Sequence, residues 1–247
     1  MARKELRHCT IEVQDGLAGT ATSAAAPVAA ATSLSPTLTA LNTIVVDQIP
    51  VGARFTIAGE TLVSGVAPIH SVLTRTPAIG GTTTAFTFSP ALGAGTYVTN
   101  ELITFLPQLI SIKLGEGDVK WTEKNEYTYD LDRGNLDGVR RANDVPMDVS
   151  FNFIFDHVRS SSGEAILPFE AITGLGAASE WVTSSIDKCE PYAVDIIVID
   201  NPPCNVLQRE TLTFTDFRSE SREASFKDAS ISISGRCNSR TPIVVRG

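Results

Sequence analysis

The clearest hydrophobic pattern in the chain is a strict alternation over residues 145–155. Apolar side chains fall on every second position from Val145 to Phe155. The residues between them include Pro146, Asp148, Ser150 and Asn152. Because successive side chains of a strand point to opposite faces, the pattern predicts a β-strand with one buried face and one polar face.

A second alternating stretch, 119–129, precedes it. Val119, Trp121, Tyr127 and Tyr129 mark its apolar side. Its polar positions are Lys120, Thr122, Lys124 and Glu126. The two stretches predict a long β-hairpin whose connection, 130–144, is far longer than the usual two to five residues. Connections of that length are commonly functional.

The connection is rich in charges of both signs. Its charged residues are Asp130, Asp132, Arg133, Asp137, Arg140, Arg141 and Asp144. One interpretation is a solvated surface loop. The other is a contact surface for a second copy of the chain, because mixed charges set the register while near-neutrality limits repulsion between identical subunits. The pattern alone leaves both open.

Most other segments also predict strands. Short β-branched or aromatic runs cover 7–13, 109–114, 192–199, 210–217 and 229–237. The run at 192–199 is apolar on both faces and is expected to be central in a sheet. Residues 167–176 contain the one helical candidate, with Pro168 at the first helical position and Gly174 just past the end.

Charge density divides the chain into a host and an insert. Residues 16–107 hold only five charged side chains, and the other 155 residues hold 18 basic and 25 acidic ones, a net charge of −7. This shift predicts a discontinuous host domain, 1–15 plus 108–247, interrupted by a small all-β module at 16–107 with five or six strands in a barrel or sandwich. The uncharged tract 19–40 is interpreted as a linker in preference to an irregular first strand.

Composition narrows the function. The net charge of −8 disfavours binding to nucleic acid through phosphate contacts. The chain has no apolar run long enough to span a membrane and no signal-peptide pattern at its start, so an intracellular product is expected. Its four cysteines form no CxxC pair, its three histidines lack metal-ligand spacing, and no nucleophile elbow or P-loop occurs. We therefore expect that the protein is not an enzyme and that it has no catalytic residues, metal or cofactor.

Six phrases of the host, in order, resemble the tail tube (major tail) proteins of long-tailed, non-contractile bacteriophages. They begin with RHCTIEVQDG, IKLGEGDVKWTEK and YDLDRGNLDGVRRANDVPMDVSFNFIFDHV, and continue with SSGEAILPFEAITGLGAASEWVTSS, DKCEPYAVDIIVID and ESREASFKDASISISGRCNSRTP. The resemblance covers essentially all of 1–15 and 108–247, and 115–155 is its most specific part. The 92-residue insert departs from the family pattern.

The resemblance implies a mainly β fold, a tail-tube-type β-sandwich or barrel with a short flanking helix and a long hairpin. It implies a structural virion protein, made in the host cytoplasm and located in the phage tail, whose homohexameric rings stack into a helical tube for DNA ejection. Tail terminator, tape measure and baseplate proteins are the other implied partners, and genomic DNA passes through without specific binding.

Carried onto this chain, the seven charged residues of 130–144 form the inter-ring stacking loop. The polar residues of the hairpin strands (Lys120, Thr122, Lys124, Glu126, Asp148, Ser150 and Asn152) line the channel. We expect a predominantly negative lumen, since fixed lysines would hold phosphates, and place the insert outside the tube. The alternatives are a single-ring virion protein, such as a tail terminator or head decoration protein, or a carbohydrate-binding adhesive module.

Overall fold

The structure is a computed structural model. It describes residues 9–41, 49–76, 83–112, 118–133, 135–154, 158–159, 165–187, 189–201, 209–225, 227 and 230–246. The chain divides into two compact units. Unit 1 comprises Met1–Glu12, Ile112–Asp156 and Asp195–Gly247, and unit 2 comprises Val13–Ser111 and His157–Val194. The limits of the expected insert, 16 and 107, lie within four residues of 13 and 111, but unit 2 also includes 157–194.

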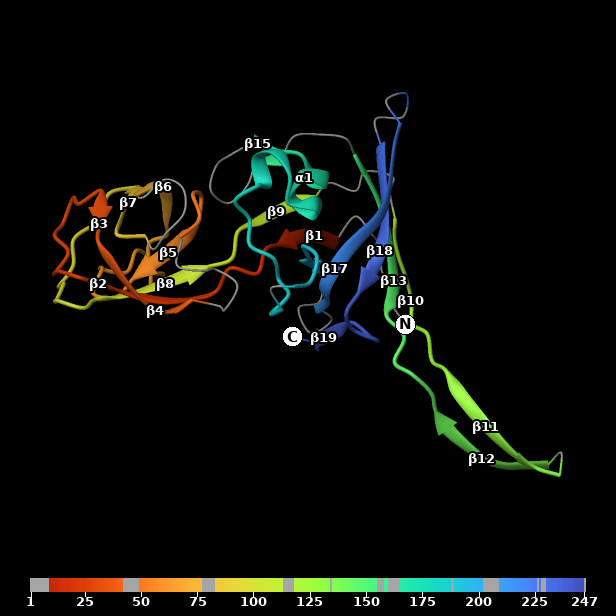
Figure 1. Cartoon of the computed structure of the whole chain (residues 1–247). Coiled ribbons are helices and arrows are strands. Elements are labelled where there is room, and N and C mark those ends of the chain that lie inside the picture. Colours follow the sequence, from red (N-terminus) through yellow and green to blue (C-terminus); the bar gives the residue numbers. More distant parts are fainter. Residues whose placement is uncertain are drawn as a thin grey trace. The chain divides into compact units, whose positions relative to one another are not determined.

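One sheet, most of whose strands belong to unit 1, has the order β10-β13-β18-β17-β16-β1-β9, and β19 pairs with β17 (Figure 1). The pairs β10–β13, β13–β18, β17–β18 and β17–β19 are antiparallel. The strands are β1 (Cys9–Gln14), β9 (Leu109–Ile112), β10 (Val119–Thr122), β13 (Met147–Ile154), β16 (Val194–Asp200), β17 (Glu210–Ser225), β18 (Ser230–Cys237) and β19 (Ile243–Arg246). As its apolar run predicted, β16 is central, between β17 and β1.

The alternation predicted for residues 145–155 is confirmed in β13. Met147, Val149, Phe151 and Phe153 are buried, while Asp148, Ser150 and Asn152 lie on the other face. The ring of Phe151 packs against those of Phe153 and Phe217, 6.1 and 5.1 Å away between centroids. These contacts fix one face of the sheet as core and leave the opposite face to polar side chains.

The predicted long strand 119–129 is wrong as a single strand. β10 ends at Thr122, and 123–126 is irregular. Beyond it, β11 (Tyr127–Asp132) and β12 (Asn135–Arg141) pair with each other in a separate two-stranded ribbon, which Figure 1 shows extending past the ends of β10 and β13. We call this ribbon the arm. The expected 15-residue loop is therefore mostly strand, because its backbone groups find partners in the ribbon.

Unit 2 contains a seven-stranded antiparallel sheet in the order β3-β7-β6-β5-β8-β2-β4. Its strands are β2 (Gly19–Ser23), β3 (Ser33–Leu34), β4 (Pro36–Leu41), β5 (Arg54–Ile57), β6 (His70–Thr76), β7 (Ala85–Ser89) and β8 (Leu102–Leu106). The core includes a cluster of phenylalanine rings around Phe55, whose centroid lies 5.3 Å from those of Phe86 and Phe88.

The interpretation of 19–40 as a linker is wrong. β2 and β4 lie in this tract and pair with each other, and β2 also pairs with β8. Ala21 is fully buried, and the hydroxyl of Ser23 accepts a hydrogen bond from the backbone N–H of Glu101. A tract of small uncharged residues is typical of a linker. Here the tract forms strands that pair with each other and with β8.

Unit 2 also holds the helix that the sequence predicted. α1 spans Pro168–Thr173, and Gly174 ends it in the left-handed conformation with φ 65°. A Cβ at position 174 would also lie 3.0 Å from the ring of Tyr192. Both the backbone conformation and the lack of space therefore favour glycine at this position. The remaining elements are β14 (Val158–Arg159), β15 (Ala165–Ile166) and the 3-10 helix η2 (Gly176–Ala178).

Candidate assembly interface

The arm has one apolar face and one polar face. Residues directly opposite each other in an antiparallel ribbon share a face, and Tyr129 pairs with Val139 and Leu131 with Leu136. The five apolar side chains of this face are Tyr127, Tyr129, Leu131, Leu136 and Val139. Each is between 51% and 65% exposed. The arm is thus an amphipathic ribbon, and among the described residues none is packed over its apolar side closely enough to bury it.

The predicted stacking residues take different places on the arm. Asp130 forms an ion pair with Arg140 on the polar face, and Arg133 lies at the turn with φ 48°. Arg141 ends β12 opposite Tyr127. Asp132 and Asp137 belong to the two strands, but their side chains lie outside the described set. Asp144 lies past the end of β12 and is part of the arm's base.

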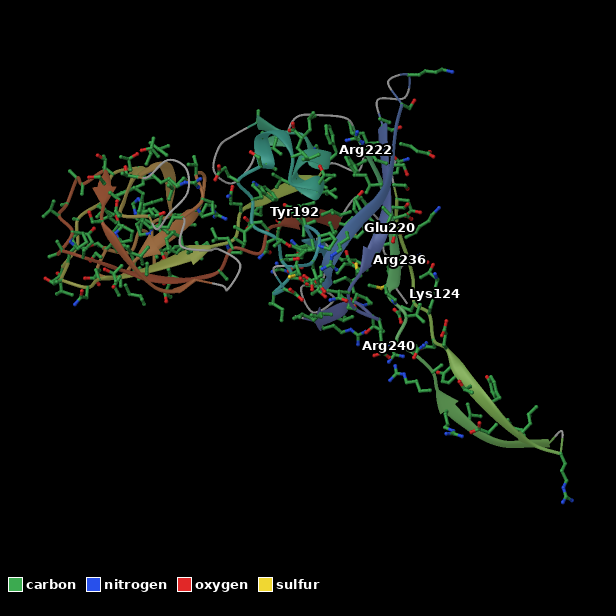
Figure 2. The ribbon with its side chains drawn as sticks, viewed as in Figure 1. Lys124, Tyr192, Glu220, Arg222, Arg236 and Arg240 are labelled. Carbon is green, nitrogen blue, oxygen red and sulfur yellow. The ribbon has the colours of Figure 1, made fainter. Side chains whose placement is uncertain are left out.

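Arg240 connects both sides of that base. Its guanidinium forms an ion pair with Asp144 at 2.9 Å and donates a hydrogen bond to the side chain of Asn125 at 3.4 Å. Asn125 belongs to the segment leading into the arm and Asp144 to the segment leading out. Arg240 therefore braces the two segments against each other where the arm leaves the sheet (Figure 2).

The predicted channel residues gather on the polar face of the sheet. Lys120 pairs with Ser150 and Thr122 with Asp148 in the β10–β13 register, and Asn152 follows on the same face. Lys120, Thr122, Asp148 and Ser150, together with residues of β17 and β18, border a hollow of about 340 Å³. Lys124 lies beyond β10 but contacts Asp148, whereas Glu126 is exposed in the segment before the arm.

Charges on this face are balanced locally. Arg236 lies 3.3 Å from Asp148 and 3.5 Å from Glu220, and Figure 2 shows Lys124, Arg236 and Glu220 along the same sheet. The amine of Lys120 lies 3.6 Å from Asp118. The hydrogen bond from Lys124 is the largest cause that lowers the pKa of Asp148, and the charge of Arg236 lowers it further. The surface therefore presents paired charges of both signs.

The histidines and metal-ligating side chains of the described residues do not cluster. No group of three His, Cys, Asp or Glu side chains there is arranged to bind a metal ion. His70 is fully buried, and both its ring nitrogens are engaged, one with the carbonyl of Pro90 and one with Glu60, each at 2.8 Å. His8 and His157 lie outside the described residues. His70 thus has a structural role, and no ring nitrogen remains for chemistry.

Other charges of the insert are also structural. Glu60 accepts a hydrogen bond from the N–H of Gly93 as well as contacting His70. Glu101 accepts one from the N–H of Val98, and Arg75 bonds Glu180 and the carbonyl of Ile49. The hydrogen bonds of these few charged side chains hold the loops of the segment in place.

A buried carboxylate joins the strands that lead into and out of the insert. One oxygen of Asp15 accepts hydrogen bonds from the backbone N–H groups of Leu17 and Gln108, at 3.2 and 2.7 Å, and the other accepts from Val182 at 3.3 Å. Burial raises the pKa of Asp15 to about 7, although these hydrogen bonds and the charge of Arg54 lower it. We call this arrangement the Asp15 clasp. Its sequence signal was a single acid at the start of the uncharged region.

The described helices include none long and apolar enough to cross a membrane. Cys9, Cys189 and Cys237 are free thiols. Comparison of the chain with protein-family models, curated proteins and solved structures found no match. The candidate interface therefore rests on the chain's own geometry: an arm with an uncovered apolar side, braced at its base beside a polar sheet face.

Proposed function

We propose that this chain is a structural subunit that assembles with copies of itself into stacked rings, forming a virion tail tube through which DNA passes. The observation that carries the proposal is the arm. A two-stranded ribbon alone in water is marginally stable, so five half-exposed apolar side chains on one need a covering surface. A neighbouring copy would supply it.

The braced base of the arm supports the same role. An arm that has to reach a neighbour binds more tightly when its direction is fixed beforehand, because less freedom is lost on contact. Arg240 restrains both connecting segments. The arm thus combines an apolar contact face with a directed base, as a joint between subunits requires.

The polar sheet face supports a conduit for DNA. A wall that binds phosphate holds the nucleic acid, and the strength of binding grows with the number of cations that neutralise phosphates. Here Lys120, Lys124 and Arg236 each have carboxylate neighbours within the face. DNA sliding along such a wall meets cations that are already neutralised.

The resemblance to tail tube proteins is the third support. It covers the host segments, including the arm and both strands beneath it. It implies a channel role for the polar face of the sheet and a stacking role for the arm. The insert is proposed to lie on the tube exterior.

Electron microscopy of concentrated, purified protein tests the proposal. Stacked rings of indefinite length are expected from the wild-type chain, whereas a single-ring virion protein would give lone rings. Replacing 127–141 by a short Gly-Ser turn should preserve the folded sheet but abolish stacking. A matched control changes Thr128 to Ser on the polar face of the arm. Normal tubes from the arm-less chain would refute the proposal.

A further inference from the structure

The uncovered face of the arm raises the question of what binds it. Tyr129 lies at the centre of this face, opposite Val139 and two pairs along the ribbon from Leu131 and Leu136. Central aromatic side chains most often carry the energy of an interface. A tyrosine also combines a large apolar ring with a hydroxyl that needs a hydrogen-bond acceptor when it is buried. The covering surface should therefore offer an apolar cavity with an acceptor beside it.

Unit 1 contains such a cavity. It has a volume of about 160 Å³, and its apolar lining consists of Cys9, Val119, Trp121, Val198 and Leu212. Two carboxylates, Asp200 and Glu210, also line it. We call it the Trp121 pocket. An apolar cavity of about 150 Å³ is large enough to bind benzene, so one aromatic ring fits.

The chemistry of the two surfaces matches. A phenol hydroxyl is a donor, and a carboxylate offers about four acceptor positions, so Asp200 or Glu210 can accept it alongside existing partners. Glu210 already receives one hydrogen bond from Arg246, at 3.1 Å. Leu131, Leu136 and Val139 offer no donor, whereas Tyr127 and Tyr129 each have a hydroxyl. Of the two tyrosines, Tyr129 is the one at the centre of the face.

The pocket and the arm of one chain do not meet. Val119 and Trp121 lie on β10, the strand that leads into the arm, and the arm continues past the end of that strand (Figure 1). Tyr129 remains 59% exposed. An arm and a receptor at different places on one molecule allow a head-to-tail contact that repeats from copy to copy, the type of contact that stacked rings require.

We propose that Tyr129 of one copy inserts its ring into the Trp121 pocket of a second copy and donates its hydroxyl to Asp200 or Glu210. This inference rests on the proposed function, because stacking brings the arm of one subunit to another. It names the residue that anchors the joint and the cavity that receives it.

The first experiment measures the lowest protein concentration at which tubes form. Tyr129→Ser should raise it by about 30-fold, the effect of losing an interface anchor. Tyr129→Phe, which removes only the hydroxyl, should raise it by about tenfold. Thr128→Ser, on the opposite face of the arm, should change it less than about twofold. Equal effects of the Tyr129 and Thr128 changes would overturn the inference.

The second experiment tests contact directly. Tyr129→Cys, in a Cys189→Ser and Cys204→Ser background, should be joined to Cys9 of another copy by a short bis-maleimide cross-linker, giving a ladder of covalent oligomers. The ladder should disappear with Cys9→Ser and should be absent for Thr128→Cys. Tubes without the ladder would overturn the pocket while leaving the proposed function standing. Absence of wild-type tubes at any concentration would overturn both.

Discussion

Replacing Asp15 by asparagine tests whether one buried carboxyl group makes the stability of unit 2 depend on pH. The folded unit holds the Asp15 proton up to about pH 7, whereas the unfolded chain releases it near the ordinary value of 3.8. Between pH 3.8 and about 7, the folded state binds more protons than the unfolded chain does. The free energy of unfolding therefore falls as pH rises from about 4 to about 7, and this contribution is level above that.

The magnitude follows from the same two values. The difference between 3.8 and about 7 corresponds to about 4 kcal/mol, since each pKa unit is worth about 1.4 kcal/mol. Asparagine keeps an acceptor oxygen for the N–H groups of Leu17 and Gln108 but carries no charge. Its amide loses only the 3.3 Å hydrogen bond from Val182. Asp15→Asn should therefore match or exceed the wild type in stability at about pH 8.

The assay is urea unfolding at several pH values between about 4 and 8, followed by the fluorescence of Trp181 in a Trp121→Phe background. Trp181 is buried next to Val182, which donates to the Asp15 clasp. The stability of the wild type relative to Asp15→Asn should decline by about 4 kcal/mol across this range. The control Asp187→Asn makes the same charge change at an exposed site. A difference that stays constant with pH would refute the reasoning.

Further predictions concern the sheet, the arm and the thiols. Gly235→Ala should destabilise unit 1 by about 3 kcal/mol in urea unfolding, because its Cβ would lie 1.9 Å from the carbonyl oxygen of Arg218; Ser234→Ala is the control. Arg240→Met should weaken the brace by about 1 kcal/mol and speed proteolysis at the arm's base about fivefold, and unchanged cleavage would contradict it. Burial and the charges of Asp195 and Asp216 raise the pKa of Cys237 to about 12. At pH 8 Cys237 should therefore react with a disulfide reagent only on unfolding, after exposed Cys189.

The sequence by itself determined the mainly β class, the short helix and the two-sided character of β13. These features are local. A period of two specifies a half-buried strand whatever lies beside it, and Pro168 and Gly174 define helix ends through their own backbone preferences. The charge-poor region, 16–107, lies within unit 2, but composition did not indicate that 157–194 belongs to the same unit.

The tertiary structure decided the arm, the extra strands and the clasp. The sequence showed the alternation of Tyr127 and Tyr129, but interpreting 130–144 as a charged loop missed its continuation to Leu131 and the pairing with β12 that forms the arm. Residues 19–40 carry no strand signal of their own, because their strands depend on partners such as β8. Nothing in the sequence around Asp15 indicated a buried carboxyl group. Its raised pKa exists because Gln108 and Val182, distant in the chain, enclose it in a place that water does not reach.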